Sequence, residues 1–120
     1  MTFEAWLNDS DSIEESARAA IAWARIQDRP TSVQFKTPAG TTLAAQTVRI
    51  EMDDDPAMMT DAGMTGQTRK GVVFGVRGHA TLADTVMAEG YRFIYNNDEY
   101  RIVDVLLTLG SLQAAVEAVG

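Results

Sequence analysis

Residues 90–107 constrain the fold more than any other part of the chain. They read GYRFIYNNDEYRIVDVLL and join two apolar, aromatic-rich runs across the polar turn 96–99. In the first run, alternate residues share one face, which is the period of a half-buried strand. These residues are Tyr91, Phe93 and Tyr95. Asn and Asp tolerate the left-handed backbone conformations of tight hairpin turns, so the segment is predicted to be a β-hairpin.

Length and composition predict a single domain, residues 1–120. The chain is 46% hydrophobic, which is enough for one core at this length. It contains no cysteine, which excludes disulfides, thiolate catalysis and cysteine-bound zinc and fits a reducing cytoplasm. The sequence shows neither an export signal nor an apolar run of the roughly 20 residues that span a membrane. We expect a soluble intracellular protein without a membrane partner.

The net charge of −7 bears on nucleic-acid binding. Affinity for phosphate backbones comes largely from clustered Lys and Arg, which displace counterions. A DNA-binding module is therefore disfavoured, whereas an acidic protein is suited to a place where DNA must pass without sticking.

A helix is predicted over residues 13–27. Ser12 and Glu15 have the spacing of a capping box, and Pro30 ends the helical stretch. Apolar residues recur at helical spacing and predict one broad face packed against the rest of the protein. This face consists of Ile13, Ala17, Ala20, Ile21 and Ala24, with Trp23 and Ile26 beside them.

After Thr31 the period changes from that of a helix to that of strands. The predicted strands lie around residues 33–37, 48–52 and 72–76, in the hairpin 90–107 and in the run 112–119. The last run also fits a helix, and only the close turn before it favours a strand. One helix followed by about six short strands predicts a mainly β fold, a small β-barrel or sandwich over 31–119 with the helix outside it.

The second strand of the hairpin, residues 100–107, is apolar on both faces. Its two faces are formed by Tyr100, Ile102 and Leu106 and by Val103, Val105 and Leu107. A strand with this pattern is expected to be buried on both sides. Either the N-terminal helix or a neighbouring subunit covers its outer face, and the sequence leaves both open.

A long inserted loop is predicted over residues 53–70, which read DDDPAMMTDAGMTGQTRK without sustained periodicity. Loops of this length tend to be functional or disordered, and methionine adapts well to irregular partner surfaces. One interpretation is therefore a loop that becomes ordered on assembly with a partner. Its candidate residues are Asp53, Asp54, Asp55, Met58, Met59, Met64, Arg69 and Lys70. The alternative is that one or two methionines cap the barrel and the others are mobile.

Residues that enzymes and metal sites use are sparse. The acidic run 53–55 lacks the alternating spacing and glycine turn of an EF-hand loop, so a solvated loop is expected. His79 is the only histidine, and no nucleophile motif accompanies it. Gly75 and Gly78 lack the spacing of a nucleotide-binding loop. The sequence predicts no catalytic residue, no metal ligand and no cofactor.

Arg69, Lys70 and Arg77 are the basic residues closest to the predicted loop, and they form a local positive spot on an acidic protein. Contact with DNA or an acidic partner is one interpretation. Charge balance with the acidic run 53–55 at the base of the same loop is the other, and it is favoured because it needs no partner.

The hairpin sequence resembles that of a known family. Residues 88–95 read AEGYRFIY, a short polar turn follows, and residues 100–105 read YRIVDV. The pattern resembles the carboxy-terminal hairpin of head-tail connector proteins of tailed bacteriophages, in which a Gly-Asp-x-Phe start and a Tyr-x-Val-x-x-Val return recur. Tyr91 stands where Asp is usual in the family. The resemblance extends more loosely from Thr31 to the end of the chain.

The resemblance implies a structural protein of the virion neck, assembled in the host cytoplasm. Such proteins form a homo-oligomeric ring, six- or twelve-fold, that closes the DNA-filled head as a stopper or joins head to tail. The implied partners are further copies of the chain, the portal or adaptor on the head side and the tail or tail-terminator protein on the tail side. Genomic DNA passes through the channel without specific binding, and loop 53–70 is the candidate to project into it.

Three other interpretations stay open. Within the neck, the chain also suits a tail-terminator or, less well because adaptors are usually more helical, an adaptor. From a different class, a small β-barrel enzyme or ligand-binding module requires His79, Asp84 and the tyrosines to line one pocket. The third is a monomeric domain that recognises another protein by edge-strand addition.

Overall fold

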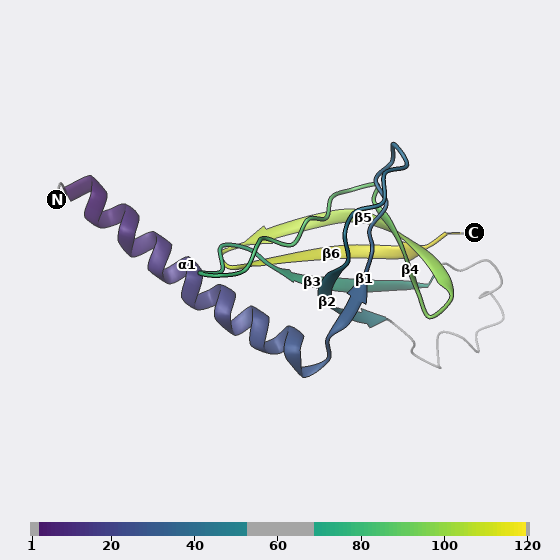
Figure 1. Ribbon diagram of the computed structural model, residues 1–120, viewed down its shortest axis with the longest axis horizontal. Coiled ribbons are helices and arrows are strands. Elements are labelled where there is room, and N and C mark those ends of the chain that lie inside the picture. The colour runs from purple at the N-terminus through teal and green to yellow at the C-terminus, as the bar shows by residue number, and fades with distance from the viewer. Residues whose placement is uncertain (1–2, 53–68, 120) are drawn as a thin grey trace.

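The computed structural model describes residues 3–52 and 69–119, with side chains described from residue 13 onward (Figure 1). Its elements are α1 (Phe3–Asp28), β1 (Thr31–Val33), β2 (Gln46–Met52), β3 (Lys70–Val76), β4 (Arg92–Tyr95), β5 (Asp98–Thr108) and β6 (Ser111–Ala118). The protein is mainly β with one N-terminal helix, as its sequence predicts.

The six described strands form one antiparallel sheet in the order β1-β2-β3-β6-β5-β4. Its two edges meet where Lys36, just after β1, exchanges two backbone hydrogen bonds with Arg92, with N–O distances of 2.8 and 2.9 Å. The sheet is therefore a nearly closed barrel, and the predicted barrel is confirmed. Closure removes most of the unpaired edge that an open sheet exposes.

The hairpin 90–107 contributes the aromatic part of the barrel core, as its alternation predicts. The rings of Phe35 and Phe93 meet edge to face with centroids 5.5 Å apart, and Phe93 stacks on Tyr100 at 5.7 Å. Such pairs add about 0.5–1.5 kcal/mol each to the burial of the rings. The other buried core residues are Val33, Val48, Ile50, Val73, Met87, Ile102, Leu112, Ala114 and Val116.

The turn of this hairpin is tighter than the four-residue turn 96–99 that the sequence predicts. β4 and β5 remain paired up to Tyr95 opposite Asp98, which leaves Asn96 and Asn97 in the turn. Their φ angles are 51° and 69°, and two consecutive positive φ angles define a type I′ turn. Asparagine tolerates this conformation, so the turn follows from the local sequence.

A β-bulge inverts the second half of β5. The register against β6 shifts between Ile102 and Asp104, which leaves Val103 as an extra residue. Because side chains alternate along a strand, one extra residue exchanges the two faces. Val105 packs against the core, and Leu106 is 58% exposed. The prediction that Leu106 shares the face of the buried half of the strand is wrong.

The run 112–119, for which the sequence left strand and helix open, is part of strand β6, which lies between β3 and β5. Its buried residues follow a period of two and are Leu112, Ala114 and Val116. The strand favoured by the preceding turn is confirmed.

The helix is longer than predicted and packs on a different face. It begins at Phe3 instead of residue 13 and ends at Asp28. Ala19 and Ile26 are fully buried, with Trp23 half-buried beside them. The face predicted to pack is exposed in its five main members, which are Ile13, Ala17, Ala20, Ile21 and Ala24.

The tip of the β5–β6 hairpin decides which helix face is buried. Gly110 has a φ of +86°, and a Cβ on it would lie 2.6 Å from the backbone N of Ala19. The Arg77 N–H also holds the tip, because it donates to the Gly110 carbonyl across 3.2 Å. A helix with apolar residues all around it has no single preferred face, so this long-range contact sets the rotation of α1.

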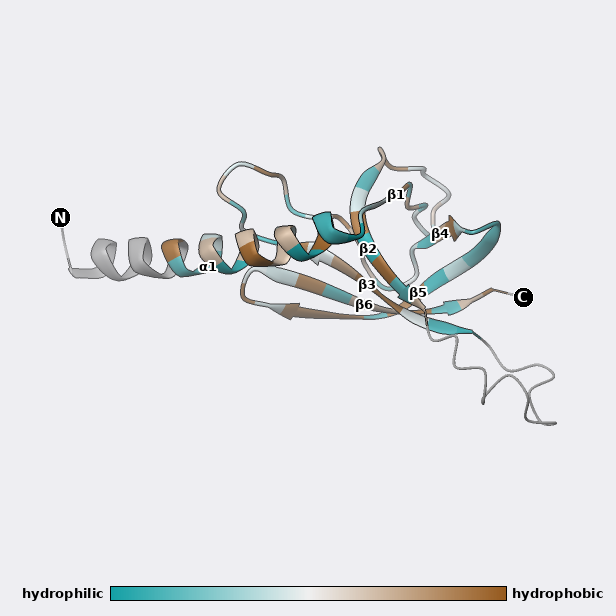
Figure 2. Ribbon diagram, turned by 90° about the horizontal axis from the view of Figure 1, so that it is seen from below, coloured by the Kyte–Doolittle hydropathy of each residue, from teal (hydrophilic) through white to brown (hydrophobic). Residues whose placement is uncertain are grey.

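Arg49 of β2 fastens the C-terminal end of α1 to the sheet. Its Nη1 donates to the Arg25 carbonyl across 3.1 Å and lies 3.6 Å from Asp28, while its Nη2 lies 2.9 Å from Glu51. The Arg49 side chain is only 16% exposed, whereas the Asp28 and Glu51 side chains are 75% and 47% exposed. The helix therefore lies against β2, β3 and β6, and its N-terminal part extends past the barrel (Figures 1 and 2).

Candidate interaction surface

Three leucines at the β5–β6 end of the barrel are exposed. Leu106 and Leu107, near the end of β5, are 58% and 57% exposed, and Leu109 in the turn is 46% exposed. Grouped apolar side chains on a soluble protein mark interaction surfaces more often than single ones do. We call Leu106, Leu107 and Leu109 the tip leucines.

The turn that carries the tip leucines is fixed by contacts with α1 and within the hairpin. Gly110, which directly follows Leu109 in the turn, is buried against α1. The Thr108 hydroxyl donates a hydrogen bond to the Ser111 carbonyl across 3.3 Å. The exposure of Leu106 and Leu107 shows that α1 does not cover the outer end of β5. The prediction that both faces of this strand are buried is therefore wrong at its end within the single chain.

A groove of about 270 Å³ separates α1 from the tip. The apolar residues that line it are Ile21, Ala22, Phe74 and Leu109. Arg18 and Arg25 line its helix side; Arg18 is 3.3 Å from Glu14, and in the described part of the chain Arg25 has no carboxylate partner. An apolar groove with basic residues along one side complements an apolar segment that carries carboxylates.

Most of the predicted loop surface lies outside the described residues. The residues concerned are Asp53, Asp54, Asp55, Met58, Met59 and Met64. Arg69 and Lys70 are described. Lys70 is the first residue of β3 instead of a loop residue. The Arg69 carbonyl accepts a hydrogen bond from the Ala118 N–H across 2.8 Å, and its Nη1 lies 3.4 Å from an Asp98 carboxylate oxygen.

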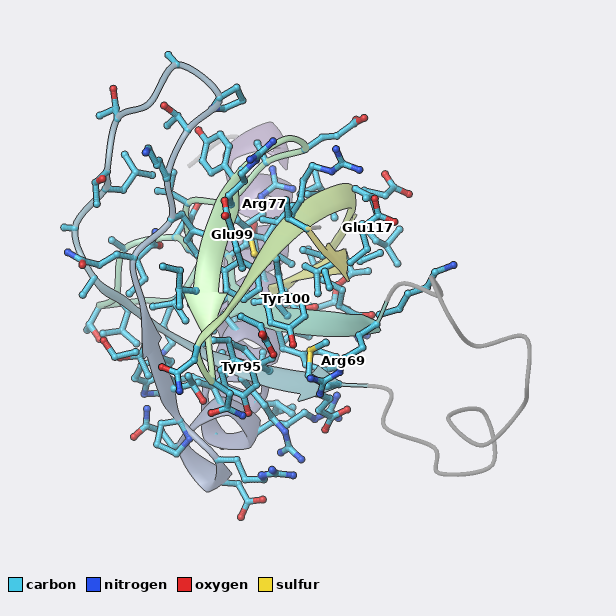
Figure 3. The ribbon with its side chains drawn as sticks, turned by 90° about the vertical axis from the view of Figure 1, so that its right-hand side faces the viewer. Arg69, Arg77, Tyr95, Glu99, Tyr100 and Glu117 are labelled. Atoms are coloured by element: carbon cyan, nitrogen blue, oxygen red, sulfur yellow. The ribbon has the colours of Figure 1, made fainter. Side chains whose placement is uncertain are left out.

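The structure separates Arg77 from Arg69 and Lys70. They lie at opposite ends of β3, roughly 20 Å apart at about 3.3 Å per residue. Figure 3 shows Arg69 with Tyr95 and Tyr100 at the end of the barrel that faces the viewer. Arg77 belongs to the other end, beside the tip leucines. The single positive spot that the sequence predicts is therefore divided between the two ends.

His79 has a structural position in the loop after β3. Its Nδ1 accepts the backbone N–H groups of Thr81 and Leu82 across 3.1 and 3.2 Å. These bonds fix the turn in the way that an Asx turn does.

Asp84 also stabilises its own loop, because its carboxylate accepts a hydrogen bond from the Gly78 N–H across 2.8 Å. The cavity of about 190 Å³ that Asp84 lines includes Trp23 and Leu82 but neither His79 nor a tyrosine. The pocket that the enzyme or ligand-binding alternative requires, formed by His79, Asp84 and the tyrosines together, is therefore not formed by the described residues.

The outer surface of β4, β5 and β6 carries paired charges. Arg92 lies opposite Arg101 on the neighbouring strand, and each has a carboxylate partner. Arg92 is 3.5 Å from Glu99, and Arg101 contacts Glu117. Exposed pairs of this kind contribute about 0–1 kcal/mol each.

The tip was not predicted from the sequence as an interaction surface. The prediction placed the partner contacts in the loop 53–70. The strand 100–107 has more apolar residues than one buried face accommodates, and this excess was the sequence signal for an exposed apolar surface. The bulge at Val103 places Leu106 on the outer face, and Leu107 and Leu109 are exposed at the same end of the barrel.

Comparisons with known proteins found no family model, no curated protein and no solved structure that matches the chain. Over the described residues, no helix combines the length and apolarity needed to cross a membrane. In the same residues, no group of three or more His, Asp or Glu side chains is arranged to hold a metal ion. The function is therefore argued from the tip leucines and the hairpin.

Proposed function

We propose that the chain is a non-enzymatic structural protein of the neck of a tailed bacteriophage, where it forms a homo-oligomeric ring that closes the head or joins it to the tail. The tip leucines carry the proposal, because they are exposed on a barrel whose own core is already filled. In a ring, each subunit presents one patch to a different patch on its neighbour. The tip leucines are the proposed apolar half of that contact.

The tip leucines alone contribute too little free energy to hold two subunits together. Full burial of one exposed leucine side chain contributes about 1.5–3 kcal/mol, and these three are only about half exposed, so together they contribute roughly 2–5 kcal/mol. Association costs an estimated 4–15 kcal/mol in lost translational and rotational freedom. A ring closes only when further contacts add to the tip leucines, which is consistent with assembly on a partner ring.

The hairpin supports the same proposal. Residues 88–105 resemble the connector hairpin in sequence, and in this fold they form the paired strands β4 and β5 of the barrel. The net charge of −7 suits a protein beside a DNA channel, since an acidic surface repels phosphate. The proposed partners are the portal or adaptor on one side of the ring and the tail on the other.

The test is electron microscopy of particles from a host in which the gene carries a nonsense mutation. Complementation with the wild-type gene should restore joined particles, whereas Leu106→Glu with Leu107→Glu should leave tails beside unjoined heads. Ile94→Glu is the control for a glutamate added to exposed surface away from the tip, because Ile94 is 70% exposed on β4. Normal particles from the Leu106/Leu107 variant would contradict the proposed role of the tip.

The same images distinguish roles within the neck. Heads that lose their DNA indicate a closure protein, whereas tails of abnormal length indicate a tail terminator. Normal joined particles from the nonsense mutant itself would refute the neck proposal altogether.

A further inference from the structure

The outer face of α1 is apolar and has no cover. Ile13 and Ile21 are 69% and 65% exposed, and three alanines lie exposed between and beside them. Figure 2, seen from the side on which α1 lies, shows hydrophobic residues recurring along the helix. We call Ile13, Ala17, Ala20 and Ala24 the helix seam.

The seam has the spacing of a helix–helix contact. Its members follow one another at intervals of four, three and four residues, which is the a/d pattern of two helices packed along each other. An isolated amphipathic helix on a barrel needs only one such face, and α1 already buries Ala19 and Ile26 against the sheet. The seam is therefore a second packing face.

The sequence of the seam is self-complementary in one orientation. Its midpoint lies between Arg18 and Ala19. If a second copy packs antiparallel about this midpoint, Ile13 lies across from Ala24 of the second copy, and Ala17 lies across from Ala20 of the second copy. Each isoleucine then meets an alanine, and the central alanines allow the helices to approach closely, which is favourable for dense packing.

The charges of α1 favour the same orientation. The part of α1 before Arg18 reads FEAWLNDSDSIEESA, with five acidic residues and no basic one, whereas the part from Arg18 onward has two arginines and one Asp. An antiparallel pair sets the acidic part of one helix beside the basic part of the other; a parallel pair sets like charges together. Glu14 would lie about 3 Å along the axis from Arg25 of the second copy, at 1.5 Å per residue.

We propose that two copies of the chain associate through the helix seam as an antiparallel α1 pair. The groove beside α1 borders the seam through Ile21 and Arg25, and Arg25 has no carboxylate partner in the described part of the chain. The N-terminal part of α1 extends past the barrel (Figure 1), so the barrel of one copy leaves this part of the helix accessible to the other. The pair has two-fold symmetry, goes beyond the proposed ring, and is measured on the purified chain alone.

The association is tested by analytical ultracentrifugation of the purified chain and two variants. The wild type should form a dimer in the micromolar range. Ile13→Glu should raise the dimer dissociation constant at least about tenfold, because it places a carboxylate in the apolar seam opposite Ala24 of the second copy. Ile94→Glu, a substitution at an equally exposed isoleucine, should leave the constant unchanged. A wild type that stays monomeric up to high micromolar concentration, or equal effects of the two variants, would overturn the proposal.

The orientation is tested by disulfide trapping, for which the absence of native cysteine gives a clean background. A mixture of Ile13→Cys and Ala24→Cys chains should form cross-linked heterodimers. Neither variant alone should, because equal positions lie about 16 Å apart in the antiparallel pair and a disulfide needs Cα atoms within about 7 Å. Efficient cross-linking of Ile13→Cys with itself would overturn the antiparallel arrangement.

Charge reversal gives a third readout. Arg25→Glu and Glu14→Arg should each weaken the dimer, and the combined variant should recover most of the loss, because the two positions exchange roles across the two-fold axis. No recovery in the combined variant would remove the charge argument. Failure of the dimer leaves particle joining unaffected, so the outcomes of this proposal and of the ring proposal are read separately.

Discussion

The two hairpins that share β5 have turns of equal length but different origins. The β4–β5 turn consists of Asn96 and Asn97, both exposed and both with positive φ. The β5–β6 turn consists of Leu109 and Gly110, and Gly110 is buried against α1. The first turn follows from the conformational preferences of its own residues. The second depends on a helix at the opposite end of the chain.

The same contrast runs along β5 itself. At its start, Tyr100 and Ile102 are completely buried in the barrel, whereas at its end Leu106 and Leu107 are more than half exposed. The bulge at Val103 lies between the two halves. One end of the strand therefore contributes to the barrel core, and the other end leaves apolar side chains exposed. The following predictions test this division.

The greatest change in stability should separate the two ends of β5. Phe93→Ala should lower the free energy of unfolding by about 3–5 kcal/mol, because it removes a buried ring that contacts two others. Leu106→Ala should change it by less than about 0.5 kcal/mol, since that side chain is exposed. Urea unfolding followed by circular dichroism measures both. Similar losses for the two variants would show that the ends are not distinct.

A smaller loss of stability is expected at the buried β5–β6 turn. Gly110→Ala should lower the free energy of unfolding by about 1–3 kcal/mol, because the backbone of Gly110 is in the left-handed region and the added Cβ would meet the backbone of α1. Gly40→Ala is a useful control, because Gly40 also has a positive φ but a Cβ on it would have no atom within 4 Å. Thermal unfolding should show the larger drop for Gly110→Ala. Equal drops would mean that the contact with the helix contributes nothing.

The contact of the tip with α1 also depends on the Arg49 contacts that hold the helix against the sheet. Arg49→Met should lower the free energy of unfolding by about 1–2 kcal/mol, because it leaves the Arg25 carbonyl without its hydrogen-bond donor and removes two carboxylate contacts. Hydrogen exchange should then rise in the last turn of α1 while the strand β5 near Tyr100 stays protected. Unchanged exchange in α1 would contradict the role assigned to Arg49.

The smallest change in stability is expected at the exposed β4–β5 turn. Asn97→Gly should change the free energy of unfolding by less than about 1 kcal/mol, because Asn-Gly is a preferred type I′ pair and Asn97 is exposed. Chemical denaturation of this variant beside Gly110→Ala compares the two turns directly. A large loss for Asn97→Gly would show that the turn side chain makes a contact that the local argument omits.

Much of the fold follows from local patterns in the sequence. The alternation of Phe93 and Tyr95 predicts a strand with one buried face, and Asn96-Asn97 predicts where the chain reverses. Apolar residues in 13–27 predict a helix, and the turn before 112 favours a strand after it. These features depend on neighbours within a few residues, which a sequence displays directly.

The candidate surface was less predictable, since contacts between distant residues decide it. The face predicted for the helix, including Ile13 and Ile21, is exposed because Gly110 meets α1 at Ala19. Leu106 is exposed because the bulge at Val103 exchanges the faces of β5. Neither the bulge nor the distant contact has a local signature in a single sequence.

Short-range patterns in the sequence account for the strands, the hairpin and its turn, and the surplus of apolar residues, because periodicity and backbone preference act over short distances along the chain. Long-range contacts in the folded chain select which apolar residues belong to the core and which stay exposed. Burial depends on the rotation of α1 and the register of β5 against β6, and both are set by contacts between segments far apart in the chain.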